Sequence, residues 1–248
     1  MYYLDCISGV SGDMLLATFL DQHDVEVPKV LGMLEKAGGV MAPTKVTTAI
    51  KDVLGTKARV LSVEFTTHGH HIDGLELKRH LENACNVIGL GPGKKFALDC
   101  IDDLLHAECR VHNEALDRIH LHETGTPDTL VDLCGMGYFY ERMGLDREGV
   151  WATPISVGGG SVRISHGLVE VPAPATRLLL EGLRFMGGPV QAELATPTGV
   201  AIIRNLVKGF VDTIPDGSKV LGQATGSKRF EMEHFVNVLR LHRGEWNG

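Results

Sequence analysis

The sequence has few aromatic residues and no excess of basic ones. Aromatic side chains make up 6% of the 248 residues, and 24 Lys and Arg against 31 Asp and Glu give a formal net charge of -7. Because nucleic acid is bound mainly through a basic surface, this balance argues against a nucleic-acid partner. It remains compatible with a nucleotide or another small anionic ligand.

Long apolar runs and paired cysteines are also missing. No stretch of about 18 apolar residues occurs and no charged-then-apolar signal opens the chain, so we expect no membrane span or secretion, and a cytoplasmic protein. The five cysteines show no paired short spacing. Their pattern argues against a disulfide framework and against a structural zinc site.

The composition is that of a folded protein, with 44% hydrophobic residues and 30 glycines. That is enough for one large or two small units with a core. Helical patterns alternate with strand patterns along much of the chain, which predicts an α/β fold with mixed sheet(s) and flanking helices. No internal domain boundary is evident within 1–248.

Local signals place most of the elements. The patterns predict strands at 2–7, 43–50, 57–67, 149–154, 219–223 and 235–241. They predict helices at 14–20, 27–37, 73–85, 96–116, 130–144, 175–180 and 200–207. We expect a turn at 54–56 between two strands, and a helix stop in left-handed geometry at Gly38-Gly39.

The stretch 120–132 concentrates imidazoles and carboxylates. In a strand, His120 and His122 point to the same side and form half of a metal site. Thr126 then suits a helix cap, Pro127 suits the first helical position, and Asp128 suits the positive end of the helix dipole. Asp128 is a further candidate metal ligand beside His120 and His122. The alternative is that it only caps the helix.

Asp132 follows Asp128 by one helical turn, among apolar neighbours. A half-buried acid needs a cation or hydrogen-bond donors, or it can act as a catalytic group. Bonds to backbone amides are the simpler explanation.

A strand, a loop of small residues and a helix also open the chain. Ser8, Gly9, Ser11 and Gly12 place backbone amides where an anion or a cofactor phosphate binds at a helix start. The loop is neither a Walker motif nor a dinucleotide fingerprint. Asp5 and Asp13 are candidate ligands of a divalent cation, although a plain strand-to-helix turn explains both residues as well.

Histidines cluster again at His68, His70 and His71, where three imidazoles in four positions predict a metal-capturing loop. His112 lies one turn after Glu108 on a predicted helix and is a further candidate metal ligand. Such a pair on its own is more often a surface contact.

Two later segments predict contacts with a cofactor or nucleotide. Gly158 and Gly159 offer a backbone with almost no side chain, either as a flexible loop or as a surface for a bulky ligand. Thr196, Thr198 and Gly199 repeat the cap-then-proline pattern of Thr126-Pro127, so two helix starts could face one anion. His166 is a candidate acid, base or ligand.

Several segments together resemble one known family, the nickel insertion proteins (LarC) of the lactate racemase maturation system. The similar segments follow the family's order over nearly the whole chain. They are Tyr3–Met14, Ala107–His112, His120–Gly125 with Asp128 and Asp132, Ser165–Gly167, Val171–Thr176 and Thr196–Gly199.

The resemblance implies insertion of nickel into pyridinium-3,5-bisthiocarboxylic acid mononucleotide, which forms the nickel-pincer cofactor. The reaction would make carbon–nickel and sulfur–nickel bonds, depend on CTP, and be assisted by manganese or magnesium. Imidazoles suit nickel, and carboxylates suit the harder ion. Chemistry at a pyridinium carbon also needs a base, for which Glu123, Asp132 and His166 are the candidates.

Full-length members of the family continue into a C-terminal domain that holds CTP. We therefore expect residues 1–248 to be the N-terminal nickel-insertion domain, working with a separate CTP-binding domain or chain and forming a homo-oligomer. The alternatives are a short paralogue with another role, a nickel metallochaperone or storage protein without chemistry, and a metal-dependent phosphohydrolase.

Overall fold

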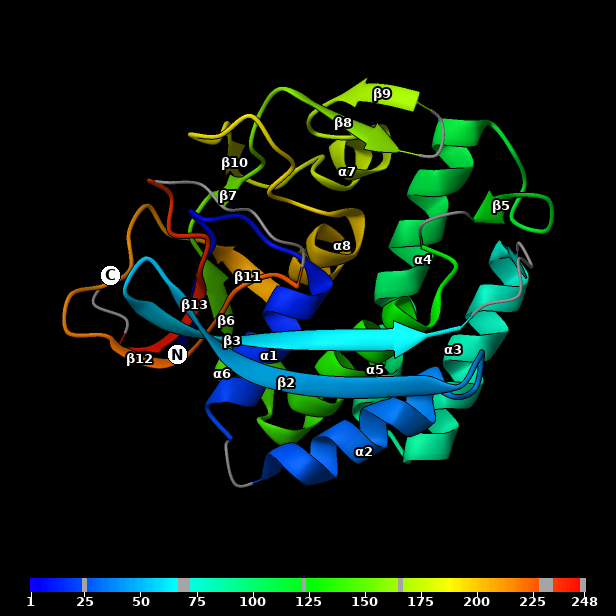
Figure 1. The fold of residues 1–248 in the computed structure, drawn as a ribbon, viewed down its shortest axis with the longest axis horizontal. Helices are drawn as coiled ribbons and strands as arrows, with labels where there is room; N and C mark the ends of the chain where they lie inside the picture. The colour runs from blue at the N-terminus through cyan, green and yellow to red at the C-terminus, as the bar shows by residue number, and fades with distance from the viewer. Residues whose placement is uncertain (24–25, 67–71, 122–123, 165–166, 228–233, 246–248) are drawn as a thin grey trace.

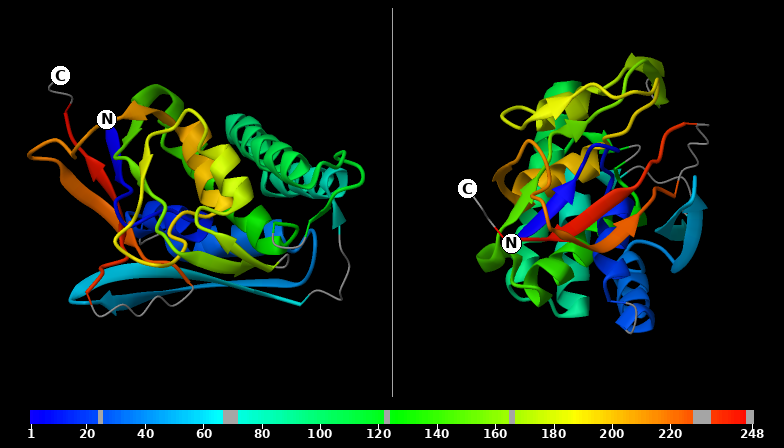
Figure 2. Two further views of the ribbon diagram at one scale, coloured as in Figure 1. Left: turned by 90° about the horizontal axis from the view of Figure 1, so that it is seen from above. Right: turned by 90° about the vertical axis from the view of Figure 1, so that its left-hand side faces the viewer.

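The chain forms one seven-stranded mixed sheet with helices packed on one side of it (Figures 1 and 2). The computed structural model describes residues 1–23, 26–66, 72–121, 124–164, 167–227 and 234–245. This architecture confirms the predicted α/β fold. All five cysteines are free. Among the described residues, no helix is long and apolar enough to cross a membrane.

The sheet has the strand order β11-β6-β1-β13-β12-β3-β2. β1 lies inside it, parallel to β6 and antiparallel to β13. The strands are β1 Tyr2–Asp5, β2 Thr44–Val53, β3 Thr56–Phe65, β6 Val150–Ala152, β11 Val207–Phe210, β12 Lys219–Ala224 and β13 Leu239–Arg243.

The helices fill the other layer. They are α1 Gly12–Asp21, α2 Val27–Gly38, α3 Gly74–Ile88, α4 Pro92–His112, α5 Pro127–Arg142, α6 Leu145–Glu148, α7 Pro174–Leu179 and α8 Pro197–Leu206. α1 packs between the sheet on one side and α5 and α8 on the other. Its residues Met14–Leu20 are all buried, as expected of a helix that is apolar all round.

β2 and β3 form a long hairpin that is fixed to the rest of the sheet mainly at one point. Leu54 and Gly55 both have positive φ, as a two-residue hairpin turn requires. Within the described ranges, β3 pairs with β12 in register at Arg59 and Ala224. There, Arg59 Nε donates to Asp21 Oδ1 over 2.9 Å, and Asp21 Oδ2 accepts from the Gln223 amide over 3.0 Å. The end of α1 thus joins the hairpin to β12.

The remaining strands form three two-stranded sheets. Their strands are β4 Ile72–Asp73 with β5 His120–Leu121, β7 Ile155–Ser156 with β10 Phe185–Met186, and β8 Ser161–Ile164 with β9 Gly167–Glu170. The β8–β9 hairpin lies at the edge of the helical layer, near α7 and α4 in Figure 1.

Several predicted boundaries were wrong, among them the start of the helix predicted at 96, which begins at Pro92. Gly39 ends α2 with φ -60, not in left-handed geometry; instead, a side chain on Gly38 would collide with Thr44. The helix predicted to reach 116 ends at His112, because Asn113 takes the left-handed conformation. β13 begins at Leu239 rather than 235.

Candidate functional site

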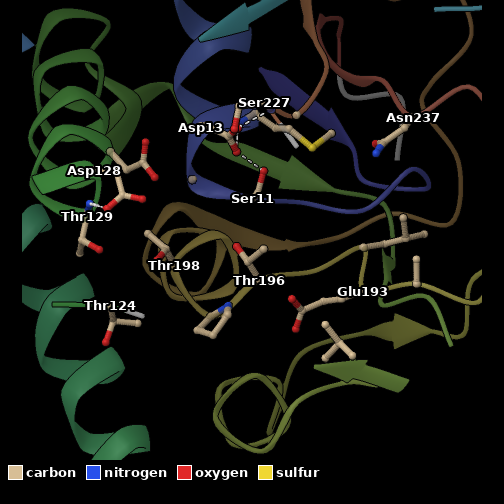
Figure 3. Close-up of a pocket in the computed structure, with 18 of the residues that line it drawn as sticks. Ser11, Asp13, Thr124, Asp128, Thr129, Glu193, Thr196, Thr198, Ser227 and Asn237 are labelled. Carbon is tan, nitrogen blue, oxygen red and sulfur yellow. Dashed lines mark hydrogen bonds between the residues drawn. The ribbon is translucent and has the colours of Figure 1, made fainter. Parts of the chain in front are cut away.

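The first turns of α1, α5 and α8 meet at a cavity of about 520 Å³ (Figure 3). Each helix start contributes residues that the sequence singled out. Lining residues are Ser11, Gly12 and Asp13 from α1, Asp128 and Asp132 from α5, and Thr196 and Thr198 from α8. Because the first N–H groups of a helix have no partner within the helix, each of these three ends brings backbone donors and a partial positive charge to the cavity.

Backbone contacts hold the starts of α1 and α8 together. Val10 bridges to Ala195 in parallel, and the Thr196 amide donates to the Val10 carbonyl over 3.0 Å. Gly199 is packed so tightly that a Cβ there would lie 2.6 Å from the Val10 carbonyl oxygen. Thr196 Oγ1 caps α8 by accepting from the Gly199 amide over 3.3 Å. Gly199 therefore brings two helix ends into contact and does not itself line the cavity.

At the starts of α1 and α5, a hydroxyl group donates to an aspartate two residues later and orients its carboxylate. Ser11 Oγ donates to Asp13 Oδ1, and Thr126 Oγ1 donates to Asp128 Oδ1. In both, the next amide also donates to that oxygen, from Met14 over 3.0 Å and from Thr129 over 3.1 Å. The second carboxylate oxygen of Asp13, Oδ2, accepts from the Ser227 amide over 2.7 Å. Oδ2 of Asp128 has no hydrogen-bond partner among the described residues.

Asp132 is the third carboxylate of the cavity and the most buried. It is 8% exposed, and its Oδ1 has no hydrogen-bond partner among the described residues. Burial, followed by the charges of Asp13 and Asp128, raises the pKa of this carboxyl well above its ordinary value. Asp132 therefore holds a proton more tightly than an exposed aspartate does.

Positive side chains are scarce around these three carboxylates. None of Asp13, Asp128 and Asp132 forms an ion pair within the described part of the chain. Arg163 is the only basic residue among the described lining residues, whereas Glu108 and Glu193 add further negative charge. Uncompensated carboxylates at helix ends can bind a hard cation, and an anion can then bind to that cation and to the helix amides.

The predicted histidine ligands lie elsewhere. His120 is exposed on β5, and His112 Nε2 lies 3.6 Å from Glu108 Oε2. Neither histidine lines the cavity, although Glu108 does. Within the described ranges, no three His, Cys, Asp or Glu residues are arranged to hold a metal ion. His68, His70, His71, His122, Glu123 and His166 lie outside the described residues.

The predicted glycines support one wall of the cavity. Gly9 and Gly158 have positive φ, and a side chain on either would collide with the segment 192–194. Gly159 donates its amide to the Ala192 carbonyl over 3.3 Å. Since residues 191–194 line the cavity, these glycines position its wall without lining it.

Two further predicted site residues, Ser8 and Asp5, make contacts outside the cavity. Ser8 Oγ donates to the Val236 carbonyl over 2.9 Å. Asp5 ends β1 beside Thr153, whose Oγ1 lies 3.5 Å from Asp5 Oδ1. Neither residue lines the cavity.

Sequence reasoning missed several residues that do line the cavity. Thr124, Arg163, Glu193, Ser227 and Asn237 come from five separate segments, and Figure 3 shows four of them as labelled sticks. Asn237 carried one usable signal, since it is a polar residue between two valines in an otherwise apolar run. The others lie in polar loops or strands where nothing local distinguishes them.

Comparison with known proteins gives a consistent result. Residues 2–247 match the family described as nickel insertion protein. Three relatives carry the name pyridinium-3,5-bisthiocarboxylic acid mononucleotide nickel insertion protein. They come from Clostridium kluyveri (33% identical, 98% of this chain and 61% of the relative), Desulfitobacterium hafniense (35%, 98% and 58%) and Staphylococcus saprophyticus (28%, 96% and 58%). The chain thus spans about three fifths of the length of these relatives. No solved structure matches it.

Proposed function

The chain belongs to the nickel insertion protein family, and we propose that it inserts nickel into pyridinium-3,5-bisthiocarboxylic acid mononucleotide. In this proposal it forms the N-terminal nickel-insertion domain of a CTP-dependent system. A separate domain or chain would supply the CTP site. The product would be the nickel-pincer cofactor of lactate racemase-type enzymes.

The observation that carries this proposal is the chemistry of the cavity. A mononucleotide with two thiocarboxylates is strongly anionic, yet the cavity holds Asp13, Asp128 and Asp132 without an ion pair among the described residues. Ligand and carboxylates would repel each other unless a cation joined them. Manganese or magnesium fits because such ions bind one or two protein carboxylates together with a substrate phosphate.

Asp13 and Asp128 would hold that hard cation. Their oxygens are oriented by hydroxyl and amide donors, as described above. The cation would supply positive charge for the substrate phosphate. The starts of α1 and α8 would add amide donors, and Arg163 would add a guanidinium at the β8 side of the cavity.

Nickel is the substrate ion and prefers softer ligands. Strands β4 and β5 pair Ile72 with Leu121, which are the described neighbours of His71 and His122 in the sequence. We propose that imidazoles from these two segments capture nickel before its transfer. His120 and His112 are the described histidines closest in sequence to the second segment.

Insertion at the pyridinium carbon requires loss of a proton. The carbon–hydrogen bond breaks, its electron pair forms the carbon–nickel bond, and the two sulfur atoms each donate a pair to nickel. Asp132 is the candidate acceptor for the proton because it lines the cavity with a buried, unpartnered Oδ1. Glu123 and His166 are the other candidates from the sequence.

The test is product formation followed by mass spectrometry. The chain is incubated with precursor, Ni²⁺ and Mn²⁺, with and without CTP and a CTP-binding domain from a full-length relative. We expect a nickel-containing product only in the complete mixture. Asp132→Asn should bind precursor and nickel yet form no product.

Other results would favour the alternatives. Nickel binding without any precursor binding would indicate a metallochaperone or storage protein. Release of inorganic phosphate by the manganese-loaded chain alone would indicate a phosphohydrolase.

A further inference from the structure

Asn237 lines the cavity and carries a buried carboxamide oxygen without a hydrogen-bond partner among the described residues. It is 6% exposed, and Figure 3 shows it on the side away from Asp128. Among the described residues, no donor reaches its Oδ1. Buried amide oxygens are nearly always hydrogen-bonded in native proteins, because losing water without a replacement partner is unfavourable. A buried, unpartnered oxygen on a side chain that lines a cavity therefore points to a donor on a ligand, which a rotation of the carboxamide would bring into reach.

The backbone around Asn237 is held in place. The Val236 carbonyl accepts from the Val238 amide over 2.9 Å, which closes a three-residue turn with Asn237 at its centre. Ser8 Oγ donates to the same carbonyl over 2.9 Å. Val238 and Leu239 after the turn are buried. The carboxamide thus extends from a fixed turn, and the hydroxyl of Ser8 ties that turn to the loop between β1 and α1.

The chemistry of the ligand limits what Asn237 can bind, and this step rests on the proposed function. The phosphate and thiocarboxylate groups of the precursor only accept hydrogen bonds at neutral pH. Its ribose hydroxyls are the groups that donate. Each hydroxyl can also accept, so one sugar edge can satisfy both the oxygen and the amide group of a carboxamide.

We propose that Asn237 recognises the ribose hydroxyls of the pyridinium mononucleotide, and that Ser8 positions Asn237 for this contact. The acidic side of the cavity, with Asp13 and Asp128, then takes the cation and phosphate. Asn237 distinguishes a ribonucleotide from a sugar without hydroxyls. Ser8 acts through the turn and does not touch the ligand.

The test compares two probes by calorimetric titration in the presence of Mg²⁺. The probes are nicotinic acid mononucleotide, a pyridinium ribonucleotide, and its 2′,3′-dideoxy analogue. Wild type should prefer the ribonucleotide by about tenfold, the effect of one good hydrogen bond. In Asn237→Ala this preference should fall to about one, through weaker binding of the ribonucleotide alone.

Ser8→Ala should lower the preference in the same way. Combining it with Asn237→Ala should cause no further loss, because both changes act on one contact. Asn83→Ala, an exposed asparagine on α3 away from the cavity, is the matched control and should keep the wild-type preference.

Thermal unfolding of the ligand-free variants separates recognition from folding. Asn237 Oδ1 has no described partner to lose, so Asn237→Ala should melt within a few degrees of wild type. If Asn237→Ala weakened both probes equally, or if wild type bound both equally, this inference would be wrong and the proposed function would stand. If wild type bound neither probe, this inference would be overturned, whereas the proposed function would fail only if the complete mixture of precursor, Ni²⁺, Mn²⁺, CTP and the CTP-binding domain gave no nickel-containing product.

Discussion

Gly12 lies directly against the carboxyl group of Asp132. A Cβ built on Gly12 would be 2.7 Å from Cγ of Asp132 and would overlap its Oδ2. The missing side chain lets the first turn of α1 approach α5 closely enough to cover this carboxyl. The buried acid thus sits at the positive end of a second helix, which favours its charged form, while burial opposes it.

Gly12→Ala should destabilise the protein by displacing Asp132 or separating α1 from α5. Overpacking of this kind costs about 1–3 kcal/mol, and each kcal/mol lowers Tm by about 2–4 °C in a protein of this size. Differential scanning calorimetry measures the change. Gly32→Ala is the control, since Gly32 lies inside α2 with no atom within 4 Å of its Cβ position. That change should raise Tm slightly. Equal changes in Tm for Gly12→Ala and Gly32→Ala would contradict the close contact between Gly12 and Asp132.

Asp132→Asn should stabilise the metal-free protein increasingly as pH rises. The folded state raises the pKa of Asp132 above the ordinary 3.8, so unfolding releases the bound proton in the window between the two values. The wild-type free energy of unfolding therefore falls through that window, by up to about 1.4 kcal/mol per pH unit, and stays lowered above it. The Asn variant carries no such proton. Urea unfolding at pH 4, 6 and 8 measures the difference.

A surface carboxyl provides the control for this experiment. Asp216→Asn removes an exposed aspartate that does not line the cavity. Its unfolding free energy should follow the wild-type pH dependence. A gap between wild type and Asp132→Asn that stays constant from pH 4 to 8 would show that Asp132 has an ordinary pKa in the folded protein.

Separate sites for nickel and for the hard cation should respond to different variants. We expect His120→Ala combined with His122→Ala to weaken nickel binding by at least tenfold and to leave manganese binding unchanged. Asp128→Asn should weaken manganese binding and leave nickel binding unchanged, because carboxylates suit the harder ion. Calorimetric titration of metal-free protein with each ion measures both. Loss of both ions in one variant would instead place them at a shared site.

Asp21→Ala should weaken the attachment of the β2–β3 hairpin. It removes the carboxylate that lies 2.9 Å from Arg59 Nε, where Arg59 is only 6% exposed, and it removes an acceptor from the Gln223 amide. Breaking a buried pair of this kind costs about 3 kcal/mol. Urea unfolding measures the loss. Asp99→Ala, which breaks the exposed pair with Lys95, should cost less than about 1 kcal/mol. Similar losses would mean that the Arg59 pair is no more than a surface contact.

The sequence determined features that depend on neighbouring residues. Thr126-Pro127 and Thr196-Pro197 start helices as predicted, because a proline at the first helical position acts within one turn. The Thr196 side chain also caps its helix, whereas the Thr126 hydroxyl donates to Asp128 instead. Leu54-Gly55 makes the predicted hairpin turn, because its geometry is set by two residues. The motifs also pointed to the family, whose model matches nearly the whole chain.

Only the tertiary structure decided which of these residues meet. Three helix starts face one cavity because Gly12 and Gly199 allow α1 to touch α5 and the loop before α1 to touch α8. Asn237 and Glu193 join them from distant segments. Gly158, predicted to form either a flexible loop or a surface for a bulky ligand, packs against Ala192. Such contacts join residues far apart in the chain, so they depend on how whole elements pack, which a local pattern of side chains does not encode.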